Sequence, residues 1–313
     1  MVDFIAQKAH IPAIIVDHSD DTVRVRQWMI YLVLTLATAT LFLMALGSAT
    51  RVMEAGLACP DWPLCFGQFV PEKQMNLQVF LEWFHRLIAT GIGLAMIAAV
   101  SLSWWQRHHL PSWFPRSISL ALLLVILQGI LGGLTVTQML RFDIVTAHLG
   151  TGLLFFSTLL TLGLLLLPYR ATGTVQQLPW LGVAAVGLVY GQSLLGGLLA
   201  SRWAVHQCLN ASQLCAILNS HLIGVVPASL GTLVTVVVAM RTPALNPVLR
   251  KIAHGAGFLL LLQIGLGVAT FRLHLQIAPL TVAHQAIGAA LLGALVGLTV
   301  LSFRDRHQFT PLS

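Results

Sequence analysis

Residues 28–49 read WMIYLVLTLATATLFLMALGSA and contain no Asp, Glu, Lys or Arg. A transmembrane helix needs about 20 mostly apolar residues, and this stretch meets that requirement. The chain has none of the alternating ten-residue segments that are typical of an outer-membrane barrel. The sequence therefore predicts an all-α integral membrane protein with eight transmembrane helices, at about 28–49, 78–104, 117–138, 143–168, 178–200, 214–240, 250–271 and 279–303.

The composition supports this class of fold. Charged residues make up 9% of the 313 residues, against roughly 25% in a typical soluble domain. A soluble globule with so few charges could not cover its own surface, so a water-soluble enzyme and a nucleic-acid binder are both excluded. The formal net charge is +7, and in so apolar a chain the basic residues are expected at the cytoplasmic membrane face.

The distribution of Lys and Arg predicts the orientation. Eleven basic residues fall on the side of the N-terminus and six on the other, which favours cytoplasmic termini. The first 27 residues are polar and include Asp17, Asp20 and Asp21, unlike the basic start of a cleavable signal peptide. We therefore expect a multi-pass protein of the cell membrane whose first apolar stretch stays as a helix.

Two pairs of histidines reveal an internal repeat. His85 and His221 are separated by 136 residues, and the same interval separates His148 from His284. Equal intervals indicate a duplicated unit. We predict two pseudo-symmetric four-helix bundles, 28–168 and 178–303, joined by a cytoplasmic linker at 169–177 and flanked by cytoplasmic tails at 1–27 and 304–313.

The four histidines point to heme. They lie in the second, fourth, sixth and eighth apolar stretches, each near the outer end, so all four share one depth in the membrane. A single buried histidine is most simply a hydrogen-bonded core residue, but four equivalent ones indicate a metal site. Zinc would need further ligands in each half, whereas a heme iron takes an axial pair from facing helices. The predicted heme-sized sites are His85/His148 and His221/His284.

Four arginines on the outer side each follow one apolar stretch, namely the first, third, fifth or seventh. Bidentate contact with a carboxylate makes arginine a good anchor for heme propionates. The alternative is ordinary interfacial snorkelling, and both interpretations stay open for Arg51, Arg141, Arg202 and Arg272.

One carboxylate breaks the symmetry of the halves. Glu82 precedes His85 by three residues, while the equivalent position before His221 holds Leu218. Residues three apart share a helix face, so we expect Glu82 in the same cavity as His85. A carboxylate there suits proton transfer or charge stabilisation, which places any chemistry in the N-terminal half. The alternative is a salt bridge to Arg86 or Arg51.

The four cysteines form two close pairs in outer loops, Cys59 with Cys65 and Cys208 with Cys215. The outer compartment of bacteria is oxidising, which favours a disulfide within each loop. A structural staple, a redox-active pair and, less favoured, zinc bound by all four cysteines are the alternatives.

These residues together resemble the heme A synthase family. The resemblance rests on Gly56-Leu-Ala-Cys-Pro-Asp-Trp-Pro-Leu-Cys65, Glu82-x-x-His85-Arg86, the signatures Gln128-Gly-Ile-Leu-Gly-Gly and Gln192-Ser-Leu-Leu-Gly-Gly, and the remaining histidines and cysteines. It covers about residues 28–303.

The resemblance implies an oxidoreductase that converts heme O to heme A by successive hydroxylations of the C8 methyl group, for terminal oxidases. It implies heme b as cofactor on His221 and His284, substrate heme at His85 and His148, catalysis by Glu82, and the disulfides Cys59–Cys65 and Cys208–Cys215. The expected partners are heme O, the lipid bilayer, a heme O synthase, an unidentified electron acceptor and a second copy of the chain, and no nucleic acid is expected.

Three other functions stay open from the residues alone. A diheme electron carrier of the cytochrome b type would use both histidine pairs, but it has no use for a carboxylate in one half only. A membrane thiol–quinone oxidoreductase would use the cysteines instead. A heme transporter is the weakest of the three.

Overall fold

The computed structural model describes residues 18–200, 213–273 and 277–306. In these ranges the chain forms eight long α-helices and two short 3₁₀ turns, and all eight helices are long and apolar enough to cross a membrane. The prediction of an all-α membrane protein is therefore confirmed. The helices are α1 (His18–Val52), α2 (Leu77–Trp105), α3 (Phe114–Thr137), α4 (Phe142–Leu166), α5 (Leu178–Leu199), α7 (Gln213–Arg241), α8 (Pro247–Arg272) and α9 (Ala278–Arg306).

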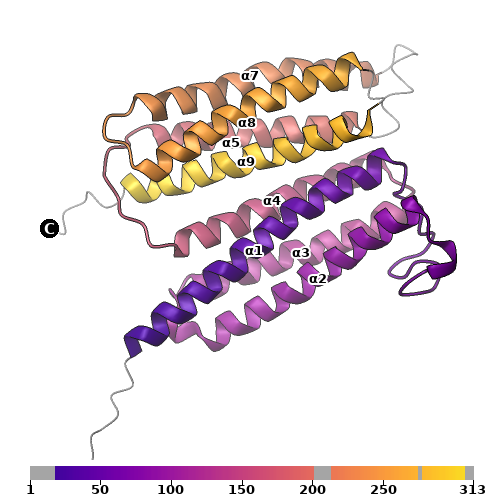
Figure 1. The fold of residues 1–313 in the computed structure, drawn as a ribbon, viewed down its shortest axis with the longest axis horizontal. Helices are drawn as coiled ribbons and strands as arrows, with labels where there is room; N and C mark the ends of the chain where they lie inside the picture. Colours follow the sequence, from indigo (N-terminus) through magenta and orange to yellow (C-terminus); the bar gives the residue numbers. More distant parts are fainter. Residues whose placement is uncertain (1–17, 201–212, 274–276, 307–313) are drawn as a thin grey trace, which may run out of the picture.

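Each half of the chain forms a closed ring of four helices (Figure 1). In the N-terminal half α1 packs on α2, α2 on α3, α3 on α4, and α4 returns to α1. The C-terminal half repeats this order with α5, α7, α8 and α9. The same packing order in both halves agrees with a duplication, and the pseudo-twofold relation itself stays a prediction.

Helix α9 forms most of the contact between the halves, packing on both α1 and α4. α4 packs on α9, α1 also contacts α9, and α4 also contacts α5. The most apolar window of α9 is 67% buried, against 17% for α3 and α8. The halves are thus joined chiefly through α9, which carries His284, and the N-terminal helices α1 and α4 that pack on it.

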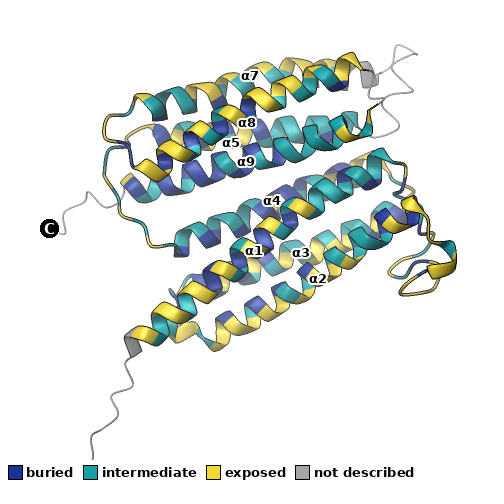
Figure 2. Ribbon diagram, in the orientation of Figure 1, coloured by how far each residue is buried: buried dark blue, intermediate teal, exposed yellow. Residues whose placement is uncertain are grey.

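The outer faces of the bundle are apolar. Exposed and buried residues alternate along the helices, with exposed stretches on the outside of the bundle (Figure 2). Many of the exposed residues are large hydrophobics, among them Trp28, Leu94, Leu120, Ile223 and Leu261. Such an apolar exterior is expected of a protein whose solvent is the bilayer core.

Local signals set the helix ends. Asn76 caps α2 by accepting a hydrogen bond from the Val79 amide, and Asn246 caps α8 in the same way through the Val248 amide. α1 differs from expectation because it begins at His18, before the apolar stretch. Asp20 and Asp21 lie in its first turn, where negative charge stabilises a helix.

The linker between the halves is fixed to the end of α9. Asp305 is fully buried and accepts hydrogen bonds from the Tyr169 hydroxyl at 3.1 Å and the Thr172 amide at 2.8 Å. Burial, together with the negative charge of Asp305, raises the pKa of Tyr169 above its ordinary value. The linker lies at the end of the bundle opposite the loop that follows α1 (Figure 1).

Candidate heme sites

Each of the four histidines lies against a glycine of the preceding helix. A methyl group built on Gly47 would come within 2.8 Å of His85 Cε1. The corresponding distances are 3.1 Å from Gly196 to His221, 3.0 Å from Gly267 to His284 and 3.5 Å from Gly132 to His148. The glycines therefore leave the space that the imidazole rings occupy.

The histidines lie six to eight residues into α2, α4, α7 and α9, so they are about 9–12 Å from the helix starts. His85 on α2 and His148 on α4 lie in one ring of helices, and His221 on α7 and His284 on α9 lie in the other. Each predicted pair thus lies at a similar depth within its own ring.

Glutamines hold three of the four histidines. Gln128 Nε2 donates a hydrogen bond to the His148 carbonyl oxygen at 2.8 Å, and Gln192 Nε2 does the same to His221 at 2.8 Å. Gln192 Nε2 also lies 3.0 Å from His221 Nδ1, and Gln263 Nε2 lies 3.4 Å from His284 Nε2. We call the glycine that each histidine lies against its cradle glycine. Each glutamine precedes the cradle glycine of its histidine by four residues, so the two lie on one helix face.

The donor set fits heme. The Nδ1 atoms of His85, His148 and His284 are buried and find no hydrogen-bond partner in the described part of the chain, which is costly unless a ligand changes their surroundings. Among residues 18–200, 213–273 and 277–306, no three His, Cys, Asp or Glu side chains cluster around a common point. Two imidazoles per half therefore suit the axial coordination of heme iron better than a zinc site.

Glu82 forms a salt bridge with Arg86, which is the alternative that the sequence left open. Arg86 Nη2 donates to Glu82 Oε1 at 2.5 Å, and the other oxygen accepts from the Cys59 amide at 2.8 Å. The side chain of Glu82 is only 5% exposed. The carboxylate is therefore fully engaged at the point where the loop after α1 meets α2.

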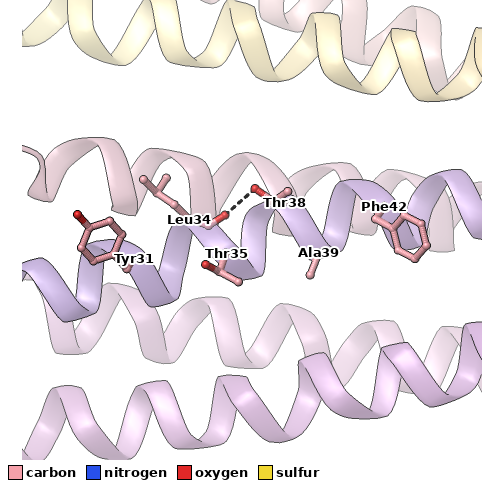
Figure 3. A pocket seen from close by; sticks show the side chains of 6 residues that line it. All are labelled: Tyr31, Leu34, Thr35, Thr38, Ala39 and Phe42. Carbon is pink, nitrogen blue, oxygen red and sulfur yellow. Dashed lines mark hydrogen bonds between the residues drawn. The ribbon is translucent and has the colours of Figure 1, made fainter.

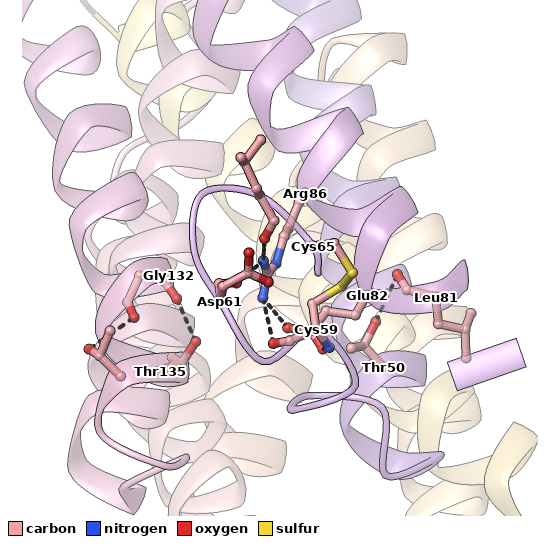
Figure 4. Close-up of polar contacts among 12 residues, drawn as sticks. Thr50, Cys59, Asp61, Cys65, Leu81, Glu82, Arg86, Gly132 and Thr135 are labelled. Carbon is pink, nitrogen blue, oxygen red and sulfur yellow. Dashed lines mark hydrogen bonds and ion pairs between the residues drawn. A yellow bond between two sulfur atoms is a disulfide. The ribbon is translucent and has the colours of Figure 1, made fainter. Parts of the chain in front are cut away.

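Arg86 ties this loop to α2. Its Nη1 donates to the carbonyl oxygens of Asp61 and Leu64, both at 2.6 Å, so the loop wraps around the guanidinium (Figure 4). Asp61 accepts from the Phe66 and Gly67 amides, and the Gly67 hydrogen bond chiefly holds the pKa of Asp61 below its ordinary value. One buried ion pair thus organises the whole Cys59–Cys65 segment.

The first predicted disulfide is present. Cys59 and Cys65 are joined and both are buried, with at most 2% of either residue exposed. Zinc bound by all four cysteines is therefore ruled out for this structure. Cys208–Cys215 lies outside the residues whose side chains the structure describes.

The four arginines have different surroundings. Arg51 Nη2 donates to Gln285 Oε1 at 2.6 Å, so it reaches from the N-terminal half to the residue after His284. Arg141 is exposed and pairs with Asp143 at 2.6 Å, and Arg272 is exposed. Arg202 lies outside the described residues. Propionate anchoring stays a prediction for all four.

A shallow groove of about 470 Å³ on α1 is a different feature (Figure 3). It runs from Tyr31 to Phe42 and is lined by apolar and hydroxyl side chains, with no His, Cys, Asp or Glu among them. It therefore adds nothing to the iron sites.

Sequence reasoning missed several residues of these sites. Gly47 lies in a stretch without the Gln–Gly signature, and Arg86 was considered only as a partner for Glu82. The glutamines were visible as part of a repeated motif, but their contact with the histidines depends on how neighbouring helices pack. Only the spacing from each glutamine to its glycine could have indicated the contact.

Gly196→Ala is expected to weaken heme binding in the C-terminal half about tenfold, because an overpacked site costs roughly 1–3 kcal/mol. The added methyl group would meet His221, whose ring Gln192 contacts from the same helix face. Heme titration of the purified protein measures the effect. Gly191→Ala is the matched control on the same helix, since nothing lies within 4 Å of its added methyl group. Equal heme affinities of the Gly196→Ala and Gly191→Ala variants would contradict the inference that Gly196 leaves space for His221.

Several known proteins are similar to this chain in sequence. The family of cytochrome oxidase assembly proteins, COX15-CtaA, matches residues 29–296. A protein named heme A synthase from Shewanella oneidensis is 34% identical over 54% of this chain and 56% of its own length. Another of that name from Rhizorhabdus wittichii is 27% identical over 84% of this chain and 90% of its own length.

A third relative has a different name. The protoheme IX farnesyltransferase of Halobacterium salinarum is 32% identical over 37% of this chain and 26% of its own length. The chain thus spans about half of the Shewanella relative and a quarter of the Halobacterium one. Since the family match includes all four histidines and Glu82, the chain belongs to the COX15-CtaA family of cytochrome oxidase assembly proteins.

Proposed function

We propose that this protein is a heme A synthase, an oxidoreductase that converts the C8 methyl group of heme O to a formyl group by successive hydroxylations. The observation that carries the proposal is the family match over residues 29–296, which includes both histidine pairs. Relatives named heme A synthase support it. The product, heme A, serves terminal oxidases.

The two histidine pairs take different hemes. His221 and His284 hold heme b as the resident cofactor, which supplies one-electron redox chemistry when bound. His85 and His148 orient the substrate, heme O, whose farnesyl tail stays in the lipid. The apolar exterior of α2 and α3 is compatible with entry from the bilayer.

Glu82 is the proposed catalytic residue of the N-terminal half. Its carboxylate stabilises positive charge or accepts a proton while the methyl group is oxidised, and Arg86 and the Cys59 amide hold it in place. Leu218 occupies the corresponding position of the other half. This difference supports chemistry in one half only.

The buried disulfide bears on one rival function. A redox-active pair must be reached by its oxidant or reductant, whereas Cys59 and Cys65 are both shielded. This favours a structural staple over a thiol–quinone oxidoreductase. The similar glycine cradles of both halves are what a diheme electron carrier would also need, so that function is the second candidate.

The proposed setting is the cell membrane, with both termini cytoplasmic and the cysteine loops on the outer side. A heme O synthase is the proposed partner. The Halobacterium relative supports it, since that protein is named for farnesyl transfer to protoheme IX and contains a segment similar to this chain. A second copy of the chain and an electron acceptor complete the proposed partners.

Mass analysis of the hemes that copurify with the protein tests the function. We expect heme b together with heme O, hydroxylated heme or heme A, because the two sites hold different hemes. Two equivalents of heme b and no oxidised heme would instead support the diheme carrier.

A further inference from the structure

Trp62, in the loop after α1, packs on α3 beside the position of His148. A methyl group built on Gly133 of α3 would lie 3.2 Å from the indole atoms Cδ2 and Cε2 and 3.4 Å from Cε3. Because three adjacent ring atoms lie at nearly equal distances, the face of the indole rather than its edge covers Gly133. Gly133 directly follows Gly132, the cradle glycine of His148. The indole therefore covers the residue next to that cradle.

The same loop is attached to α2 beside His85. Arg86 directly follows His85 and donates hydrogen bonds to the carbonyl oxygens of Asp61 and Leu64, both at 2.6 Å (Figure 4). These two carbonyls lie on either side of Trp62 in the chain. The indole is thus held between residues that adjoin both histidine positions of the N-terminal half.

Further restraints keep this loop in one conformation. The buried disulfide Cys59–Cys65 closes the loop, and Asp61 accepts hydrogen bonds from the amides of Phe66 and Gly67, both at 2.6 Å. A surface that is already ordered loses little conformational entropy when a ligand contacts it. The face of Trp62 is therefore preorganised for contact.

One face of the indole is accessible. Trp62 is 49% exposed although the other face of its ring covers Gly133. A porphyrin extends beyond its iron in every direction, so a heme on His85 and His148 reaches the residues that adjoin these positions. Flat aromatic systems favour offset-stacked or edge-to-face contacts with one another. The indole of Trp62 can make such a contact with a porphyrin.

We propose that Trp62 packs against the porphyrin of the heme held by His85 and His148. The indole positions the heme and takes no part in the chemistry, and the ion pair of Glu82 with Arg86 sets its place through the loop. The inference rests on the proposed function only in that the N-terminal site holds a heme. The alternative is an interfacial tryptophan whose accessible face meets the membrane surface.

The test is the affinity of the N-terminal site for hemin. The purified, full-length protein is stripped of exchangeable heme with excess apomyoglobin and titrated with hemin, followed by Soret absorbance. The binding that His148→Ala removes belongs to the N-terminal site. We expect Trp62→Leu to weaken this binding about tenfold, near the upper end of the range for aromatic pairs. Trp62→Phe keeps an aromatic face and should stay within about threefold of the unaltered protein.

An unchanged affinity of Trp62→Leu for hemin would overturn the proposal. The titration does not need heme A to be made. A protein that proves to be a diheme carrier can therefore still pass or fail this test.

Trp83→Phe is the matched control for the seating of the loop. Trp83 Nε1 donates a hydrogen bond to the Phe69 carbonyl oxygen at 2.7 Å, so this variant loosens the same loop without removing the indole of Trp62. It should bind hemin as tightly as the unaltered protein. Equal weakening by Trp83→Phe and Trp62→Leu would show that loop seating controls the affinity, contrary to the proposal.

Fluorine NMR keeps the proposal testable if Trp62→Leu fails to assemble. The protein is labelled with fluorotryptophan, kept under dithionite so that a bis-histidine heme iron is diamagnetic, and titrated with zinc protoporphyrin IX. The resonance that Trp62→Phe removes should shift, because the porphyrin ring current acts at short range. The resonance that Trp83→Phe removes should shift less. An unshifted Trp62 resonance at saturation would contradict contact with the porphyrin.

Discussion

Replacing Glu82 with Gln is expected to reduce heme A formation about 10²- to 10⁴-fold, the range of general acid–base catalysis, while heme b stays bound. The amide keeps the size of the side chain, and its one oxygen can still accept a hydrogen bond from the Cys59 amide. It removes the negative charge and the proton-accepting oxygen, and its NH2 group cannot accept the hydrogen bond that Arg86 donates to Glu82. Heme A is quantified by mass analysis of extracted hemes after expression with a heme O synthase.

The salt bridge with Arg86 requires a control for loop structure. If Glu82 only seats the Cys59–Cys65 loop, the Gln variant should retain most of its activity, and Arg86→Gln should do more harm by removing contacts to Asp61 and Leu64. Alkylation of the two cysteines after mild reduction reports whether the loop is still seated. A Gln variant that makes heme A at the normal level would show that the carboxylate is not catalytic.

Simple physical rules made most of the fold predictable. Apolar stretches such as 28–49 and 143–168 correspond to α1 and α4, because a helix that crosses a bilayer must be long and apolar. The start of α1 at His18 was missed, since the stretch before residue 28 is polar and its helical turns lie beyond the apolar span. The resemblance to the heme A synthase family is supported by the match to the COX15-CtaA family.

The site was only partly predictable from the sequence. The interval of 136 residues identified the four histidines as equivalent positions of a repeat, and the structure places two of them in each ring of four helices. The contacts of Arg86 with Asp61 and Leu64 depend on the path of a loop, which no periodicity encodes. The link from Arg51 to Gln285 crosses between the halves and depends on how α1 packs on α9.

Glu82 and the C-terminal histidines should affect different measured quantities. Glu82 should determine the amount of heme A formed, and the histidines should determine the amount of heme b bound. Arg86 and the Cys59 amide hold Glu82 in the N-terminal half, whereas His221 in the C-terminal half contacts Gly196 and Gln192. Loss of a carboxylate should therefore spare the cofactor, while loss of an axial ligand should remove it. This separation distinguishes an enzyme with one reactive half from a carrier with two equivalent halves.

Substituting Ala for both His221 and His284 is expected to lower the heme b content below about a tenth of that of the unaltered protein, because the iron loses both axial ligands. A pyridine hemochrome assay of the purified protein measures the content. His254→Ala is the matched control, since this exposed histidine of α8 contacts the Arg250 carbonyl oxygen. It should leave the heme b content unchanged. If the double variant retained its heme b while replacement of both His85 and His148 removed it, the cofactor would belong to the N-terminal half, and the roles of the two halves would be reversed.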